Sequence, residues 1–306
     1  MKKRGFLFFT LVTIIIVVVA VPACKMQYDP KKVEYVAVKD NGEIQEGKRL
    51  AVLMCAPCHY NEATKKFSGA LLENVPGIVG KVYSKNITQH PTKGIASYTD
   101  AELAYLIRTG IGRDGKLMPY MQKPNLANED LDAIIAFLRS DDELVKPVDI
   151  ESGKTKYTVV GKLGISRSKP FQWPSEVIGK PDKADRIAIG KYLVDNLLCY
   201  SCHSKSVISV NKKFPEKSKG YMGGGSKLKD RSRSTIVSPN LTANTTGIGN
   251  WTEQDFVKAM RAGISKDNSI ITYPMPTYNE LTDTELSAIF AYLKTIPSIT
   301  NKIKKK

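Results

Sequence analysis

Two short stretches of the chain combine residue types that carry out chemistry. Residues 55–59 read CAPCH and residues 199–203 read CYSCH, so in both a pair of cysteines is followed directly by a histidine. The remaining cysteine, Cys24, lies far from either pair in the sequence. Such a pair can exchange thiols with a disulfide, bind a metal ion or attach a cofactor covalently. The sequence around the pairs has to decide among these uses.

The two motifs belong to two copies of one repeated unit. Both follow Gly-Lys and a helix-like spread of apolar residues, and residues 86–111 align with residues 240–264 with a single gap. Each copy then contains a helix that is predicted to begin after an N-cap threonine and to end at a glycine. These end residues are Thr99 and Gly110 in the first copy and Thr252 and Gly263 in the second. A last helix is predicted over 128–138 in the first copy and over 282–293 in the second. The chain is therefore predicted to be all-α, a tandem duplication of one helical domain.

The repeat discriminates among the three uses of the cysteine pairs. A redox-active pair is typical of an α/β fold, and this chain has little strand signal. A zinc site needs a fourth ligand; His90 could complete the first site, but the aligned residue in the second copy is Asn244. Covalent haem attachment uses two thiols and the histidine that follows, which both copies have. We predict two haem c groups, with Cys55, Cys58, Cys199 and Cys202 as attachment residues and His59 and His203 as proximal iron ligands.

The opposite face of each iron needs a methionine or a histidine if the iron is to shuttle electrons. In the second copy Met275 lies in a proline-flanked loop before the last helix. In the first copy Met121 is the closer match when counted back from the last helix, and Met118, which keeps the Met-Pro pair, is the alternative. His90 is a further candidate for this position. The other methionines considered are predicted to pack in the core; they are Met54, Met222 and Met260.

The N-terminus predicts export. A positively charged start precedes an unbroken apolar run from Phe6 to Val21 and then small residues before Cys24, which is the layout of a secretory signal. The letters VPAC resemble the bacterial lipobox, in which the cysteine after the cleavage site carries lipid. We expect residues 1–23 to be a signal peptide and Cys24 to be the lipidated residue of a membrane-anchored protein facing the periplasm. An uncleaved N-terminal membrane anchor is the alternative.

The charge of the chain bears on its partners. It has 46 Lys and Arg against 30 Asp and Glu, a formal net charge of +16. The basic residues are spread along the chain, without an arginine-rich helix or an aromatic platform, so nucleic acid is not the expected partner. The expected partner is instead a protein with an acidic surface.

The segments between the repeated units carry weaker signals. We expect a tether over 24–44, domains over 45–146 and 181–297, a linker over 147–180 and a basic tail over 298–306. The letters YTVVGKLGI in the linker predict a strand or an extended segment. The triple glycine of YMGGGSKLKD predicts a turn, since no P-loop spacing follows it.

At the level of whole segments, both units resemble class I cytochrome c domains, and together they resemble the dihaem cytochromes c of bacterial membrane electron-transfer chains. The similar segments include SPNLTANTTGIGNWTEQDFVKAM, YPMPTYNELTDTELSAIFAYL and LDAIIAFLRSDDELVKP. The resemblance implies that the helix leading into each cysteine pair crosses the last helix of its domain, with a glycine packed on an aromatic ring. The implied pairs are Gly47 with Phe137 and Gly190 with Tyr292.

Two functions follow as hypotheses. The first is an electron carrier without substrate chemistry, tethered to a membrane. Its donor would be a periplasmic dehydrogenase or a quinol-oxidising complex, and its acceptor a terminal oxidase or another cytochrome; it could also be the cytochrome subunit of one dehydrogenase. The second is a dihaem peroxidase, which would need one iron with an open sixth position. The similar architecture of the two units favours the carrier.

Overall fold

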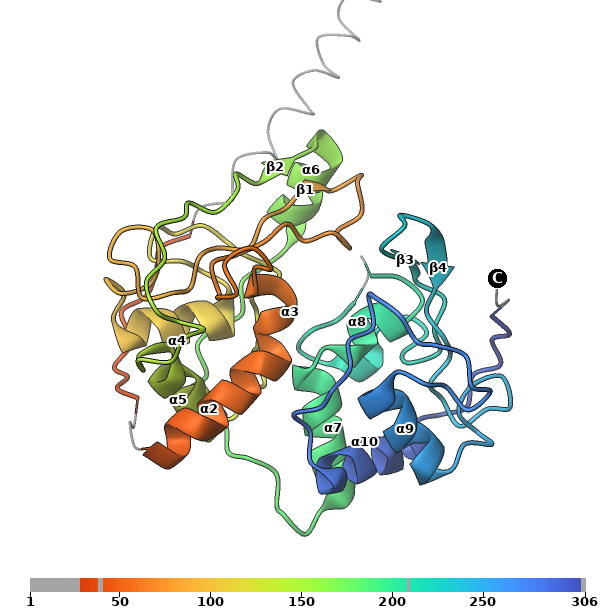
Figure 1. Ribbon diagram of the computed structural model, residues 1–306. Coiled ribbons are helices and arrows are strands. Elements are labelled where there is room, and N and C mark those ends of the chain that lie inside the picture. Colours follow the sequence, from red (N-terminus) through yellow and green to blue (C-terminus); the bar gives the residue numbers. More distant parts are fainter. Residues whose placement is uncertain (1–27, 38–40, 208–209, 304–306) are drawn as a thin grey trace, which may run out of the picture.

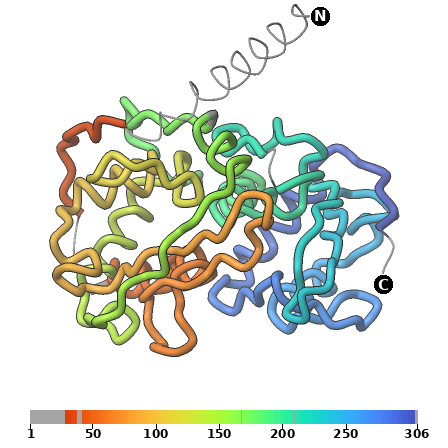
Figure 2. Tube along the Cα trace, turned by 90° about the horizontal axis from the view of Figure 1, so that it is seen from above, coloured from red at the N-terminus to blue at the C-terminus, as the bar shows by residue number. Residues whose placement is uncertain are grey.

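The computed structural model describes residues 28–37, 41–207 and 210–303. Figure 1 shows two mostly helical lobes side by side, the first in orange to yellow-green and the second in green to blue, and Figure 2 shows the same division from above. Cys24 and the rest of the expected signal segment lie outside the described residues. Within the described part of the chain, no helix is both long and apolar enough to cross a membrane.

Each lobe contains the same set of helices. In the first they are α2 (Asn41–Met54), α3 (Ala56–His59), α4 (Asp100–Thr109) and α5 (Asn128–Leu138). In the second they are α7 (Arg186–Asn196), α8 (Cys199–His203), α9 (Glu253–Ala262) and α10 (Asp283–Thr295). The predicted all-α fold and the predicted duplication are confirmed, because the four helices follow one another in the same order in both domains.

Strands are short and peripheral. Strand β1 (Gly80–Lys81) pairs antiparallel with β2 (Lys156–Tyr157), and β3 (Lys227–Lys229) pairs antiparallel with β4 (Thr235–Val237). The second pair lies in the insert after the CYSCH motif, next to a 3₁₀ helix, η2 (Pro215–Lys217). These pairs stiffen loops and leave the core to the helices.

Helix boundaries follow the local signals in the sequence. The hydroxyls of Thr99 and Thr252 accept from the third residue of α4 and α9, and a carboxylate at that residue returns the bond, so both helices begin with a capping box. Both end at a glycine in the left-handed region, Gly110 at φ 80° and Gly263 at φ 64°. The predicted caps are confirmed in both copies.

The first and last helices of each domain cross at a glycine. A Cβ on Gly47 would lie 1.8 Å from the carbonyl oxygen of Ala133 and 2.9 Å from the Cβ of Phe137. On Gly190 it would lie 2.1 Å from the carbonyl oxygen of Ala288 and 2.7 Å from the Cβ of Tyr292. The implied crossings are confirmed, and backbone as well as the aromatic residue excludes a side chain there.

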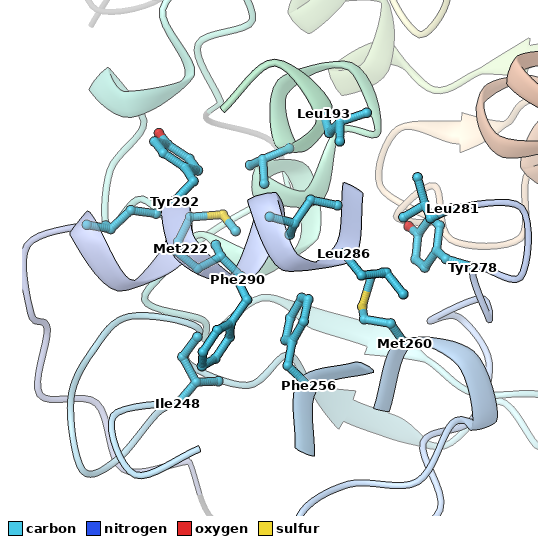
Figure 3. Packing of buried hydrophobic residues seen from close by; sticks show 14 of the residues in the cluster. Leu193, Met222, Ile248, Phe256, Met260, Tyr278, Leu281, Leu286, Phe290 and Tyr292 are labelled. Carbon is cyan, nitrogen blue, oxygen red and sulfur yellow. The ribbon is translucent and has the colours of Figure 1, made fainter. Parts of the chain in front are cut away.

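The core of the second domain lies between α7, α9 and α10. Figure 3 shows Phe256 of α9 facing Phe290 of α10, with their ring centroids 5.4 Å apart, and Met260 lying against Leu286. Met222 is fully buried in the same cluster, and Met54 packs against the cores of both domains. The methionines predicted to be core residues therefore pack as expected.

The linker differs from the prediction. Only Lys156–Tyr157 is a strand, and α6 (Val159–Arg167) forms where a strand or extended segment was expected. The hydroxyl of Thr158 caps α6 by accepting from the amide of Gly161. Gly161 itself packs so closely on the carbonyl of Val79 that a Cβ would lie 2.0 Å from its oxygen. The helix thus combines a local signal, the Thr158 cap, with a tertiary contact of Gly161 on Val79.

The segments expected at the edges of the domains also pack on them. Trp173 of the linker lies between Tyr35 of the expected tether and Tyr105 of α4, with ring centroids 6.1 and 6.2 Å away. At the other end of the chain, Asn240 donates to the carbonyl of Ile299, and Asn301 donates to the carbonyl of Gly223. The start of the expected basic tail is therefore part of the second domain, whereas residues 304–306 lie outside the described chain.

Candidate functional site

The four motif cysteines lie on the short helices α3 and α8 or next to them: Cys55 directly precedes α3, Cys199 begins α8, and Cys58 and Cys202 each lie one residue before the histidine that ends the helix. All four are partly buried, and none forms a disulfide. Burial raises the pKa of Cys55 to about 11 and that of Cys199 to about 12, and it raises the pKa of Cys58 and Cys202 as well. Protonated thiols are poor nucleophiles, so the environment is the opposite of the one that activates a redox-active cysteine pair.

Each motif histidine is oriented by a backbone carbonyl. Nδ1 of His59 lies 2.7 Å from the carbonyl oxygen of Lys85, and Nδ1 of His203 lies 3.0 Å from that of Pro239. Burial lowers the pKa of both imidazoles, so both are neutral near pH 7 and donate their Nδ1–H to the carbonyl. The lone pair then resides on Nε2, which is the tautomer a proximal iron ligand needs.

The repeated letters NIT and NLT fix these carbonyls. Asn86, the residue after Lys85, accepts through its side chain from the amide and the hydroxyl of Thr88. Asn240, the residue after Pro239, does the same with Thr242. The two buried turns are therefore alike, and each holds an acceptor at its histidine.

Glycines with positive φ complete this side of each site. The amide of Gly69 donates to the carbonyl of His59 at 2.9 Å, and the amide of Gly224 donates to that of His203 at 2.7 Å. Their φ angles are 86° and 70°, and a Cβ on either would lie 2.5–2.6 Å from neighbouring backbone atoms. The triple glycine expected to be a turn thus has a supporting role in the second site, which its match with Gly69 could have revealed.

The opposite side of the first site is occupied by Met121. Its Sδ lies 3.4 Å from Nε2 of His59, so the thioether and the imidazole lone pair face each other. Met118 lies elsewhere: its methyl carbon packs 2.8 Å from where Gly112 would carry a Cβ, and its amide donates to the carbonyl of Gly110. In the second domain Ile271 makes the matching bond to Gly263, so Met118 takes the place of an isoleucine.

The remaining candidates lie as follows. Met275 packs half-buried against the core of the second domain, and its amide donates to the carbonyl of Thr272. His90 accepts at Nδ1 from the amides of Thr92 and Lys93, and its Nε2 lies 3.5 Å from a carboxylate oxygen of Asp149. Both ring nitrogens of His90 thus face partners in its own loop region. Among the described residues no three His, Cys, Asp or Glu side chains gather into a metal-ion site.

A lysine between the two sites was not predicted. Lys123 lies two residues after Met121, and its ammonium donates to the carbonyl of Asn196 in the second domain at 2.6 Å. Burial lowers its pKa, against the opposing influence of Cys55, Cys58 and Cys199. One lysine therefore lies within electrostatic reach of attachment cysteines from both domains, and the two sites flank the domain boundary.

The fold and the site define a class of protein. Two helical domains each combine a paired-cysteine motif, a neutral buried histidine and a methionine loop, which is the arrangement of a c-type cytochrome. Residues 44–141 and 187–297 match the family model of cytochrome c, and the chain belongs to the cytochrome c family.

Relatives with assigned functions agree with this family. The chain is 31% identical over 277 residues to the fructose dehydrogenase cytochrome subunit of Gluconobacter japonicus, covering 83% of this chain and 53% of that subunit. It is 29% identical to the cytochrome c subunit of the quinone alcohol dehydrogenase of Gluconacetobacter polyoxogenes, covering 85% of this chain and 57% of that subunit. It is 26% identical to a diheme cytochrome c-type protein of Cereibacter sphaeroides, covering 84% and 87% of the two chains. The chain thus spans a little over half the length of the first two relatives.

The residues present fit two covalently bound haem c groups, one in each domain. The thiols are free, the imidazole tautomer is fixed, and in the first domain an imidazole nitrogen and a thioether sulfur face each other. The predicted cofactor is thereby supported by the family, by the dihaem relative and by the chemistry of the donor set.

Proposed function

We propose that the protein carries single electrons between redox proteins and performs no substrate chemistry of its own. The observation that carries the proposal is the closed pair in the first domain, with His59 Nε2 and Met121 Sδ 3.4 Å apart. When bound, each haem supplies an iron that alternates between the ferric and ferrous states. A site closed on both sides by protein ligands leaves no position for a substrate.

The proposed axial ligands are His59 and Met121 in the first domain, and His203 and Met275 in the second. Each histidine donates from Nδ1 to a fixed carbonyl, which orients the ring and makes Nε2 more basic. A thioether is a softer ligand than a second imidazole and raises the reduction potential. With both ligands held by packed loops, little moves when an electron arrives.

The partners follow from the relatives and from the charge. Two of the relatives are cytochrome subunits of dehydrogenases, so we propose a dehydrogenase as the electron donor and an oxidase or another cytochrome as the acceptor. The formal charge of +16 would steer the protein toward acidic surfaces on these partners. Lys123, which interacts electrostatically with cysteines of both motifs, lies at the boundary between the two domains.

A redox titration combined with carbon monoxide binding tests the carrier function. We expect two one-electron transitions, a reduced spectrum that carbon monoxide does not change, and no consumption of hydrogen peroxide. The reason is that both irons would keep two protein ligands in both oxidation states. Rapid carbon monoxide binding at one haem of the unmodified protein, together with peroxide turnover, would instead favour the peroxidase.

We further propose that the protein is exported and anchored to a membrane by lipid on Cys24, as the apolar run and the VPAC letters suggest. Cys24→Ser is expected to abolish incorporation of labelled fatty acid and to release the protein from washed membranes. Measuring both in a bacterial host that lipidates exported proteins distinguishes the alternatives, because an uncleaved N-terminal anchor would keep the variant on the membrane.

A further inference from the structure

The contact between the two domains repeats the internal symmetry of the chain. Arg49 of α2 and Tyr192 of α7 occupy the same position, two residues after the glycine at which the helices cross. Each reaches across the boundary to a carboxylate at the third residue of the other domain's last helix, Glu285 of α10 or Asp130 of α5. The two halves therefore meet as the subunits of a symmetric dimer do, with the same surface on both sides.

Arg49 forms a bidentate ion pair with Glu285. Its Nη1 and Nη2 donate to the two carboxylate oxygens of Glu285 at 2.9 and 3.0 Å, and Nη1 also donates to the carbonyl of Glu280 at 2.9 Å. The side chains of Arg49 and Glu285 are only 22% and 18% exposed, so solvent screens the pair little. The same Glu285 carboxylate accepts from the amide of Thr282 at the start of α10. The first domain thus holds both the end of the Met275 loop and the beginning of the last helix.

The Tyr192 contact completes a helix cap. Helix α5 begins after Ala127, which has no side chain able to cap it. The hydroxyl of Tyr192 accepts from the amide of Ala127 at 3.0 Å and donates to the carboxylate of Asp130 at 2.5 Å. It therefore bridges the same two groups, the N-cap amide and the third-residue carboxylate, that bond directly in α10. The second domain caps the last helix of the first.

Further contacts hold the loop before each of these helices. We call residues 118–127 the first methionine loop and residues 271–281 the second. The first loop forms four hydrogen bonds with the second domain. The carbonyl of Pro119 accepts from Lys212, and three groups of the loop donate: Lys123 to Asn196, Asn125 to Lys213 and Ala127 to Tyr192. The second loop receives bonds from Asn74 at Tyr273 and from Arg49 at Glu280.

We propose that each domain holds the methionine loop of the other, so that Arg49 positions Met275 and Tyr192 positions Met121. The inference rests on the proposed methionine ligation. It assigns to Arg49 and Tyr192 a crossed effect: a change in one domain loosens the axial methionine of the haem in the other. The two centres are thereby coupled through the domain contact.

The reduced holoprotein allows a direct test, because the methyl group of an iron-bound methionine gives a strongly upfield-shifted proton NMR signal. Met121→Leu and Met275→Leu are used to assign one signal to each haem. Tyr192→Phe, which removes one oxygen atom, is expected to weaken only the Met121 signal and to raise carbon monoxide binding at the first haem roughly tenfold. Arg49→Gln is expected to weaken the methyl signal and raise carbon monoxide binding only at the Met275 haem. Arg49→Lys, which keeps the positive charge, is expected to recover part of the Met275 signal.

Neighbouring lysines provide matched controls. Lys48 and Lys191 lie on the same helices but pair within their own domains, with Asp142 at 2.7 Å and with Asp195 at 2.6 Å. Lys48→Gln and Lys191→Gln should leave both methyl signals unchanged. Effects of Tyr192→Phe or Arg49→Gln confined to the haem of their own domain, or absent at both haems, would overturn the proposal. If Met121→Leu and Met275→Leu themselves remove no signal, the ligation proposal fails instead.

Discussion

Replacing Met121 by alanine is expected to open the first haem to carbon monoxide and to lower its reduction potential by roughly 0.1–0.2 V, on a scale over which axial ligands move haem potentials by about 0.8 V. Loss of the thioether removes the soft ligand that favours ferrous iron and frees the position facing His59 Nε2. A redox titration and carbon monoxide difference spectra measure both effects. Met275→Ala should do the same to the other haem only.

Met118→Ala is the control for this prediction. Its side chain packs on Gly112, and its place in the second domain is taken by Ile271, which has no ligating atom. The reduction potentials of both haems should therefore be unchanged in Met118→Ala. A variant Met118→Ala that binds carbon monoxide while Met121→Ala does not would reverse the assignment.

Gly47→Ala is expected to destabilise the fold strongly. The new methyl carbon would meet the carbonyl oxygen of Ala133 at 1.8 Å, and backbone cannot move aside as a flexible side chain can. The two helices would separate and lose the packing between them, a loss of roughly 3 kcal/mol or more in the free energy of unfolding. Thermal unfolding of the holoprotein, followed by circular dichroism, should show a fall of roughly 10 °C in the midpoint.

Gly164→Ala separates this steric effect from helix propensity. Gly164 lies within α6, and no atom lies within 4 Å of the position that its Cβ would take. Alanine is favoured over glycine inside a helix by about 1 kcal/mol, so this variant should be as stable as the unmodified protein or slightly more so. Equal unfolding midpoints for Gly47→Ala and Gly164→Ala would refute the close crossing.

Sequence patterns predicted those parts of the fold whose signals are local. The cysteine-histidine motifs, the Thr99 and Thr252 caps and the terminal glycines each depend on residues a few positions apart, and they recur in both copies. Counting back from the last helix favoured Met121 over Met118, and this choice of ligand stays a prediction. The matching backbone bonds of Met118 to Gly110 and of Ile271 to Gly263, which only the fold reveals, agree with it.

The contacts between the domains could not be predicted in the same way. Arg49 and Glu285 are 236 positions apart, and Tyr192 and Asp130 are 62 apart. Both pairs consist of ordinary surface residue types, arginine with glutamate and tyrosine with aspartate, which carry no motif. Helix α6 was missed in part for a related reason: its Thr158 cap is a local signal, but the close packing of Gly161 on Val79 is visible only in the fold.

The lysine at the domain boundary makes the two cysteine motifs electrostatic neighbours. Lys123 donates to the carbonyl of Asn196 in the second domain at 2.6 Å, and it interacts electrostatically with Cys55 and Cys58 of the first motif and with Cys199 of the second. A single charge at the boundary is therefore shared by both halves of the duplicated chain, and replacing Lys123 would alter the surroundings of both motifs at once.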